Sequence, residues 1–595
     1  MSAPAASAAA AAPAAASKSY KYDEGSYVVL DADSNQARGL AEYAIDMLNG
    51  SLLANVPSGA AKGPDAVVLQ RTELFHTDSV VCGLSALALG TNAPTVLRAE
   101  ALDYEQGAKS VLLSAKVFGS KKRVVAEKAI AANVSAVREW DSNGTVFGFN
   151  PRLGKEHMAG EFGHNDFYQV VVAACQAKGL SGDVALLAML LTDEIRGRLA
   201  EVFSLKTFHI DHVVHGAIAS AAVYGALVGA TVAQIESAIG MVVAHYIPFR
   251  AIRAGEQLSD SKGASAALSS EVAVMSVHRS IRGFVGPADI FRNPEAIFRK
   301  FKPTTPKMTA EGNSPFRLVL THSGLDWAVM GMHFKLGLYE HQSAGALQGV
   351  IDIFRKNPSL LSSKLKSIKI IAYQPAFGII GDPSKRRPET RQSADHSMVY
   401  IIATLIKKAR SVAAAAAGGA LAADQIGLWS SLMLLPIDYS RTSIRDADTQ
   451  ALMKLIEFEH GGPSYDEKYP EGIPTSVVIT TEAGESHDSG MVLFPAGHAR
   501  YQGPWTDIEQ ILKHKFETLA ALAVADVPSA LSKLTDLKSK KAKDIESLYE
   551  FDIAFKHGPN VAAPAAAAAR GKGKKRVRED EPAAAAAAEP EAMEY

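Results

Sequence analysis

The sequence predicts a mainly α-helical protein with an α+β insertion. Its 595 residues, 47% of them hydrophobic, can bury a large core divided into two or more domains. Apolar residues recur at helical spacing from about residue 36 to 330, whereas β-branched alternation bounded by Gly and Pro begins after about 331. We therefore expect a large helical domain over 26–330, a smaller α+β domain over 331–501, and a helical return to the first domain over 502–556.

The helical domain is predicted from three apolar segments. They are "ARGLAEYAIDMLNG" (37–50), "DVALLAMLLTDEIRGRLAEVF" (183–203) and "HGAIASAAVYGALVGATVAQIESAIGMVVA" (215–244). Their Gly and Ala residues at neighbouring turns allow close contacts between helices, and strand-like alternation is scarce in this part of the chain.

The α+β domain is predicted from strand-like segments with helical ones between them. Strands are expected in "LKSIKIIAYQPAFGII" (365–380) and "GIPTSVVITTEAGESHDSGMVLFPAGH" (472–498), and a helix in "HSMVYIIATLIKKARS" (396–411). The segment "TDIEQILKHKFETLAALAVADVPSALSKL" (506–534) is helical again, with Thr506 or Asp507 placed to cap it.

Both ends of the chain are predicted to be disordered. Residues 1–25 and 557–595 are rich in Ala and Pro and too poor in aromatic residues to offset chain entropy by burial. The second tail carries the basic cluster "RGKGKKRVRED" (570–580), which resembles a nuclear import signal, so residues 570–578 are a candidate contact for an import receptor. The alternative is a solvated tail that only aids solubility.

Composition narrows the functional class. A formal net charge of -1 gives no general attraction to nucleic acid or to an acidic membrane, and no apolar run is long enough to predict a membrane span. Cys82 and Cys175 form at most one disulfide, which fits a reduced compartment. Without a secretory or mitochondrial leader, a cytoplasmic location is expected, with mitochondrial or nuclear locations as alternatives.

Familiar cofactor and nucleophile motifs do not occur in the sequence. There is no GxxxxGK[ST] phosphate loop, no dinucleotide fingerprint between a strand and a helix, and no GxSxG elbow. The spacing of "HIDHVVH" (His209, Asp211, His212 and His215) allows a metal site but lacks the HExxH pattern. The favoured interpretation is a helix entrance at which one histidine points into a cavity and the others meet local polar groups.

A polar segment, "REWDSNGTVFGFNPRLGKEHMAGEFGHNDFYQ" (138–169), runs directly into the apolar "VVVAACQA". Asp141 and Thr145 lie four residues apart, and His164 precedes a helix expected to begin near Phe167. A histidine at that boundary is well placed to meet a carboxylate substrate, although the Asp and Thr alone also suit turn capping.

Two lysines lie among small or apolar residues. They are Lys262 in "LSDSKGASAALSSEVAV" and Lys335 in "MGMHFKLGLYEHQSAGALQG". Partial burial lowers the pKa of a lysine or demands an anionic partner, and both effects suit the binding or deprotonation of an organic acid. The ordinary alternative is that each ammonium reaches the surface.

Taken in chain order, these segments resemble the MmgE/PrpD family over residues 36 to 555. "WDSNGT", "FGHNDFYQVVVAA", "HIDHVVHGAIASAAVYGALVGATVAQIESAIG", "SKGASAA", "FKLGLYEHQSAGALQG", "SADHSMVYIIA" and "VLFPAGHARYQ" are similar to seven blocks of the family in order. The resemblance implies a helical domain built from both ends of the chain, an inserted α+β lid, an active site between them, no metal or organic cofactor, and a homodimer.

The resemblance also implies a set of site residues. The catalytic ones are Asp141, Thr145, His164, Lys262 and Lys335, and those that contact substrate are His212 and His341. Arg250 and Arg253 are further candidates for contacts with the substrate's carboxylates. These residue types suit proton transfer at a carbon next to a carboxylate, with cations that hold the substrate's other carboxylates.

The implied activity is that of a cofactor-independent lyase on a citrate-like tricarboxylic acid. The favoured reaction is the dehydration of 2-methylcitrate to 2-methylaconitate, in propionate catabolism. Alternatives are the decarboxylation of cis-aconitate to itaconate, and an inactive family member that acts as a nuclear or scaffold protein. The chain departs from the family pattern at "GHNDFY", in place of "GHPSDN", and at "WDSNGT", where glycine replaces the second aspartate.

Overall fold

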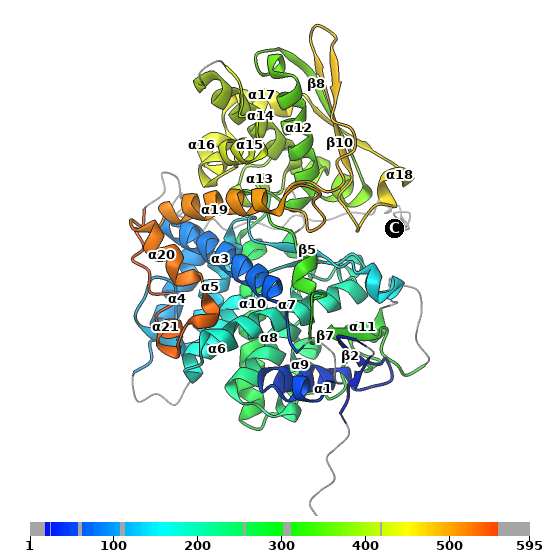
Figure 1. Cartoon of the computed structure of the whole chain (residues 1–595), viewed down its shortest axis with the longest axis vertical. Coiled ribbons are helices and arrows are strands. Elements are labelled where there is room, and N and C mark those ends of the chain that lie inside the picture. The colour runs from blue at the N-terminus through cyan, green and yellow to red at the C-terminus, as the bar shows by residue number, and fades with distance from the viewer. Residues whose placement is uncertain are drawn as a thin grey trace, which may run out of the picture.

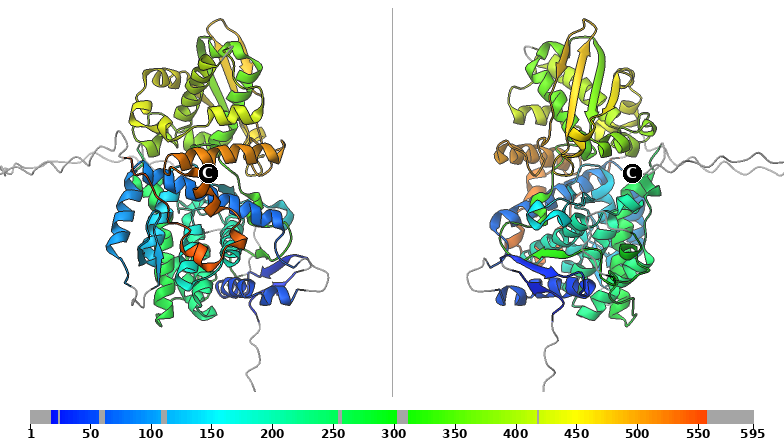
Figure 2. Two further views of the ribbon diagram at one scale, coloured as in Figure 1. Left: turned by 60° about the vertical axis from the view of Figure 1, so that its left-hand side comes forward. Right: turned by 90° about the vertical axis from the view of Figure 1, so that its right-hand side faces the viewer.

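A computed structural model of the chain describes residues 18–23, 25–56, 62–107, 113–253, 257–301, 311–416 and 419–556. The protein is mostly helical with small sheets, as the sequence predicted. Figure 1 shows two lobes, and α19 lies between them in both further views of Figure 2. The exact domain boundaries stay predictions.

The lower lobe is a layered bundle of helices. Its helices are α1 (Gln36–Leu48), α2 (Ser51–Ala54), α3 (Ala66–Ala88), α4 (Asn92–Asp103), α5 (Ala126–Glu139), α6 (Tyr168–Lys178), α7 (Gly182–Val202), α8 (Val213–Val228), α9 (Val232–His245), α10 (Asp260–Ile281) and α11 (Ile297–Lys300). Helix α10 packs against α5, α8 and α9. The helical period of the sequence is thus confirmed in α1, α7, α8 and α9.

Small antiparallel sheets lie among these helices. They join β1 (Lys21–Tyr22), β2 (Tyr27–Leu30) and β7 (Leu318–Thr321); β3 (Ser114–Lys116) and β4 (Arg123–Val125); and β5 (Thr145–Phe147) and β6 (Phe162–His164). Strand β1 corrects the predicted disorder over 1–25, because it pairs with β2 and the buried Tyr20 hydroxyl donates to Asp46 at 2.8 Å. The expectation for residues 1–17 lies outside the described residues.

The upper lobe combines one sheet with a group of helices. The sheet has the order β11 (Ser486–Asp488), β10 (Thr475–Thr481), β8 (Leu365–Ala372), β9 (Ile456–His460). The helices are α12 (Ala344–Lys356), α13 (Arg391–Ala394), α14 (Met398–Ala415), α15 (Gln425–Leu432), α16 (Arg441–Ile444), α17 (Ala447–Met453) and α18 (Pro463–Asp466). Strands β8 and β10 pair antiparallel, whereas β8 and β9 pair in parallel. The predicted strands and the helix after His396 are confirmed.

The chain then returns to the lower lobe through α19 (Trp505–Ala521), α20 (Val527–Leu534) and α21 (Ala542–Glu546). The predicted cap of α19 is wrong: the helix begins at Trp505, and Pro504 occupies the N-cap position. Proline lacks an N–H and therefore suits a helix start. The negative charge of Asp507, in the first turn, interacts favourably with the positive end of the helix dipole. Helix α19 packs against both α3 and α15, so it links the two lobes.

Two further expectations concern cysteine pairing and membrane spans. Cys82 and Cys175 are both buried free thiols. Among the described residues no single helix is long and apolar enough to cross a membrane, although α3 and α4 meet that test of length and composition as a pair bent by 90°. The basic cluster 570–578 lies outside the described residues.

Candidate active site

The polar segment forms a turn and a short hairpin between α5 and α6. Asp141 follows the end of α5 and is fully buried, and its backbone carbonyl accepts a hydrogen bond from the Tyr339 N–H at 2.9 Å. Strands β5 and β6 then pair Thr145 with His164, and α6 begins at Tyr168. The hairpin therefore holds the acid, the hydroxyl and the histidine of this segment close together.

Asp141 lies at the centre of a buried cluster of positive charge. The ammonium of Lys335 contacts its Oδ1 atom directly. Its Oδ2 atom lies 2.8 Å from His396 Nε2, 3.4 Å from Arg138 Nη2 and 3.6 Å from Lys262 Nζ. Burial opposes ionisation of Asp141, but Arg138, Lys335, His396 and Lys262 outweigh it and hold the pKa of this carboxyl well below its usual range.

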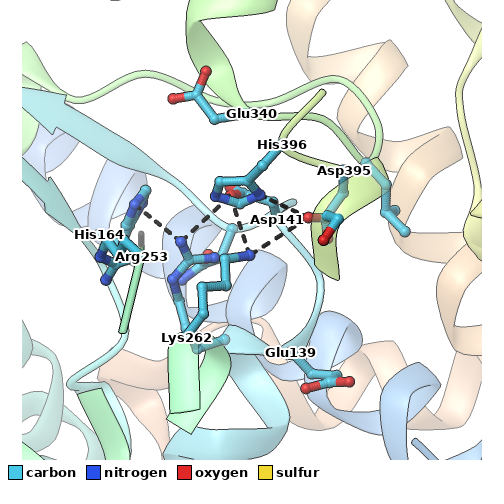
Figure 3. A network of polar contacts seen from close by, with 12 residues as sticks. Glu139, Asp141, His164, Arg253, Lys262, Glu340, Asp395 and His396 are labelled. Carbon is cyan, nitrogen blue, oxygen red and sulfur yellow. Dashed lines mark hydrogen bonds and ion pairs between the residues drawn. The ribbon is translucent and has the colours of Figure 1, made fainter. Parts of the chain in front are cut away.

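A second carboxylate, Asp395, enters the cluster from the upper lobe. Its Oδ1 atom lies 2.7 Å from His396 Nδ1 and 3.5 Å from Lys262 Nζ, and its Oδ2 atom lies 3.0 Å from Arg391 Nη1. Arg391 also reaches Glu139 on the lower lobe, with Nη2 2.5 Å from Oε1. Figure 3 shows His396 between Asp141 and Asp395, so this group of residues joins the two lobes.

Lys262 lies in the first turn of α10 and is fully buried. Its ammonium is near two carboxylates but makes no hydrogen bond in the described part of the chain. Burial lowers the pKa of Lys262 to about 8, although the charges of Asp395 and Asp141 partly oppose this effect. A lysine with a pKa near 8 is partly neutral at physiological pH and suits general-base chemistry.

His164 faces a second histidine across the cluster. Its Nε2 atom lies 3.2 Å from Arg138 Nη2, and its ring packs edge to face against His212 with 5.2 Å between centroids. An arginine only donates, so Nε2 is the acceptor and the proton of neutral His164 lies on Nδ1. Burial and the charge of Arg138 hold the pKa of His164 well below its usual range, so its ring is neutral and its Nδ1 is a donor without a partner among the described residues.

The two arginines lie on a short 3-10 helix beside His212. Arg253 forms an ion pair with the buried Asp211 and donates from Nη2 to Ser265 Oγ at 3.2 Å. Arg250 keeps a buried Nη1 that has no hydrogen-bond partner in the described structure. Figure 3 shows Arg253 on the same side of the network as His164.

Two of the predicted residues are directed elsewhere. The Thr145 hydroxyl donates to the Gly163 carbonyl at 2.9 Å. The His341 ring stacks on His333, with 4.9 Å between centroids, and neither of its nitrogens has a partner among the described residues. The structure therefore joins Asp141, His164, Lys262 and Lys335 in one network, while the roles of Thr145 and His341 stay predictions.

The histidines of "HIDHVVH" diverge, but the expectation that all but one of them meet local polar groups is wrong for His215, whose ring nitrogens have no hydrogen-bond partner among the described residues. His209 is exposed, His212 faces His164 at the start of α8, and His215 stacks on Phe298 with 6.4 Å between centroids. In the described part of the chain, the group with ligand atoms within 4.8 Å of one another is Asp141, Asp395 and His396. A metal ion there would compete with the cations that already contact both carboxylates.

Several members of this cluster were not predicted from the sequence. They are Arg138, Arg391, Asp395 and His396, together with Glu340, whose backbone contacts Asp395 and whose carboxyl accepts the Gln342 N–H at 2.8 Å. The Glu340 N–H donates to the Asp395 carbonyl at 2.9 Å, and burial, helped by the charge of Asp141, raises the pKa of its carboxyl to about 8. The sequence contained a signal for the two acids, because Glu340 in "YEHQS" and Asp395 in "SADHS" both lie in segments that resemble the family. Neither acid was assigned a role from the sequence.

Comparison with known protein families adds a sequence match over part of the chain. The sequence model of the MmgE/PrpD N-terminal domain matches residues 56–308. Residues 56–308 therefore belong to the N-terminal domain of the MmgE/PrpD family. The matched region includes Asp141, His164 and Lys262, whereas Lys335 and Asp395 lie beyond it. Membership supports a dehydratase-type activity of the kind that acts on citrate-like acids.

Proposed function

We propose that this MmgE/PrpD protein is a cofactor-independent lyase for a citrate-like tricarboxylic acid, with 2-methylcitrate dehydration as the favoured reaction. One observation carries the proposal: several buried nitrogen atoms in and beside the Asp141 cluster have no hydrogen-bond acceptor among the described residues. They are Arg138 Nε and Nη1, His164 Nδ1, both ring nitrogens of His212, Arg250 Nη1 and Lys262 Nζ. Buried donors normally have partners, so this set suits a ligand rich in carboxylate oxygens.

The cationic residues have a binding role in this proposal. A tricarboxylate brings six acceptor oxygens, and guanidinium groups hold carboxylates with paired hydrogen bonds. Arg138 and Arg250 are the proposed carboxylate contacts, and the His164 Nδ1–H is directed to the carboxylate next to the reacting carbon. Negative charge develops on that carboxylate when the proton leaves, so a fixed donor there lowers the barrier.

Lys262 is the proposed general base. The carboxyl of Asp141 is too acidic for that role, because its charged neighbours, Arg138 and Lys335 foremost, hold its pKa well below the usual range. The pKa of Lys262, near 8, leaves part of the population neutral at physiological pH, with a lone pair on Nζ. The amine takes the proton from the carbon next to the carboxylate, and the electron pair of that C–H bond forms the new double bond.

Glu340 is the proposed general acid. A carboxyl with a pKa near 8 retains its proton at neutral pH, unlike Asp141 and Asp395. As the carbon–oxygen bond breaks, this proton joins the departing hydroxyl and water leaves. Lys262 ends the cycle as an ammonium and Glu340 as a carboxylate, so one proton transfer between them restores the site.

The first test is a proton NMR assay of the purified full chain at neutral pH in the presence of a chelator. It supplies 2-methylcitrate, citrate and cis-aconitate separately. Formation of 2-methylaconitate from 2-methylcitrate is the expected result. If itaconate forms from cis-aconitate instead, the reaction catalysed at this site is a decarboxylation and not the proposed dehydration.

The assay needs a control that separates chemistry from folding. Lys128 pairs with Glu271 of α10 at 2.7 Å but lies outside the cluster, so Lys128→Met is the matched variant and should retain turnover. If folded wild-type protein converts none of the three acids, the proposed function is wrong. The scaffold hypothesis would then be tested by deleting residues 557–595 and following localisation.

A further inference from the structure

The upper lobe contains a cavity of about 670 Å³ that is separate from the acid-binding cluster. It lies between the loop 386–389, α14, α16, α17 and the start of β9. Helices α16 and α17 are at the left of the upper lobe in Figure 1, on the side away from β8 and β10. We call it the basic cavity because of the side chains that line it.

Positive charge dominates the rim of the basic cavity. Four cationic side chains line it, Arg386, Arg387, Arg445 and Lys454, together with a single carboxylate, Glu389. Among the described residues none of these four cations forms an ion pair. Nearby lysines behave differently, since Lys407 pairs with Asp446 at 2.7 Å and Lys408 with Asp438 at 2.8 Å.

The floor of the basic cavity is apolar. It is formed by Pro388, Val399, Ile444, Met453 and Ile456, all of them buried. A cavity with a cationic rim and an apolar floor is complementary to a molecule that has a charged group at one end and a ring or apolar body at the other. Arginines in particular match phosphate oxygens through their planar fork.

The loop that carries the first two arginines is held in place before any ligand binds. Gln257 fixes it twice: Nε2 donates to the Arg387 carbonyl at 3.0 Å, and Oε1 accepts from the Glu389 N–H at 2.9 Å. The Arg386 guanidinium lies over the Phe458 ring, 5.2 Å from its centroid, and donates to the Gly381 carbonyl. A rim that is already ordered loses less conformational entropy on binding.

The geometry points to a binding site for a small phosphorylated molecule with a ring or apolar body. The basic cavity is connected to the proposed active site through the chain, because the loop 386–389 continues into Arg391 and Asp395, and Val399 follows His396 by three residues. Arg391 joins Asp395 to Glu139, so a shift of the loop would alter the surroundings of the cluster. We therefore expect occupancy to change the turnover of the lyase.

Calorimetric titration of the full chain with inorganic pyrophosphate and with ADP, at 150 mM salt and without substrate, tests the site. The matched pair of variants is Arg445→Ala and Arg441→Ala: both remove one exposed charge from the α16 segment, but only Arg445 lines the cavity. Arg445→Ala is expected to weaken binding at least tenfold, as loss of a charge-assisted hydrogen bond does. Arg441→Ala is expected to change it less than twofold.

The outcomes are distinct. Tighter binding of ADP than of pyrophosphate would indicate that the apolar floor contacts the ligand and that a nucleotide-like molecule is the occupant. Equal binding would indicate inorganic polyphosphate. If neither probe binds the wild type, or if both variants weaken binding equally, there is no specific site and the inference is wrong. Binding is measured without substrate, so its failure is independent of the proposed lyase activity.

Discussion

Two buried lysines near the junction of the lobes differ in how their charges are satisfied. Lys515 of α19 donates to the carbonyls of Ser142 and Lys335, at 2.7 and 2.8 Å, and pairs with Asp78 at 2.6 Å. Lys262 of α10 is equally buried but makes no hydrogen bond among the described residues. A satisfied buried charge holds a structure together, whereas an unsatisfied one is maintained at the expense of stability and suits function.

Removal of the unsatisfied lysine should have the largest effect. Lys262→Met is expected to reduce kcat by about 10² to 10⁴, the usual contribution of a general base. Stability should rise rather than fall at neutral pH. A lysine whose pKa falls from 10.5 to about 8 on folding lowers stability by on the order of 3 kcal/mol below pH 8. NMR turnover and urea unfolding measure the two quantities.

The sign of the stability effect follows from proton binding. Between about pH 8 and 10.5 the unfolded lysine holds its proton and the folded one does not, so the stability of the wild type rises with pH across this window. The advantage of Lys262→Met should therefore disappear as the pH increases. If the Lys262→Met variant is inactive and also strongly destabilised, Lys262 has a structural role. The proposed difference between Lys262 and Lys515 would then be wrong.

Removal of Lys515, the lysine with hydrogen-bond partners, should lower the stability of the fold. Lys515→Met leaves Asp78 buried without its cation, and breaking a buried pair in this way costs about 3–5 kcal/mol. It should also loosen the turn at Ser142 and the segment at Lys335, which share its ammonium. Urea unfolding measures the effect.

Lys513→Met is the matched control on the same helix, because Lys513 is exposed and its loss should change stability by less than about 0.5 kcal/mol. If Lys515→Met is as stable as Lys513→Met, the ion pair of Lys515 does not stabilise the fold. The proposed difference between Lys515 and Lys262 would then be wrong.

The pH dependence of turnover sharpens the assignment of the base. If neutral Lys262 is the base, kcat/KM should increase with pH along an ascending limb that lies near pH 8. The charge of Asp395 raises the pKa of Lys262, so Asp395→Asn should move this ascending limb to lower pH. Glu340 must retain its proton, which predicts a descending limb that also lies near pH 8.

Glu340→Gln separates the two groups. It should remove the descending limb and leave the ascending limb in place, since glutamine does not titrate. An ascending limb that does not respond to Asp395→Asn would assign the base to another residue.

The sequence predicted the helices better than it predicted the site. Periodic segments such as 183–203 became helices because their pattern is local. The predicted cap residue of α19 was wrong because proline can also occupy a helix start, in competition with the usual Ser, Thr and Asp. Short strands such as β5 were missed, since three residues carry too little alternation to be recognised.

Within the site, the predicted residues were those with a local sequence context. Lys262 was noted for its small neighbours and Asp141 for its polar segment. Asp395 and His396 enter the cluster through contacts with Lys262 and Asp141, which lie more than 130 positions earlier in the chain. No local pattern reports such contacts, and burial of Glu340, which raises its pKa, is likewise a property of the folded chain.

The smallest expected effect concerns Thr145, which the family resemblance placed among the catalytic residues. Its hydroxyl donates to Gly163 in the β5–β6 hairpin, so Thr145→Val should lower stability by about 1 kcal/mol through the lost hydrogen bond. Thr145→Ser retains the hydroxyl and should behave as the wild type. A fall in kcat of more than a hundredfold in the valine variant, restored by serine and without a change in stability, would place the hydroxyl in the chemistry beside Lys262.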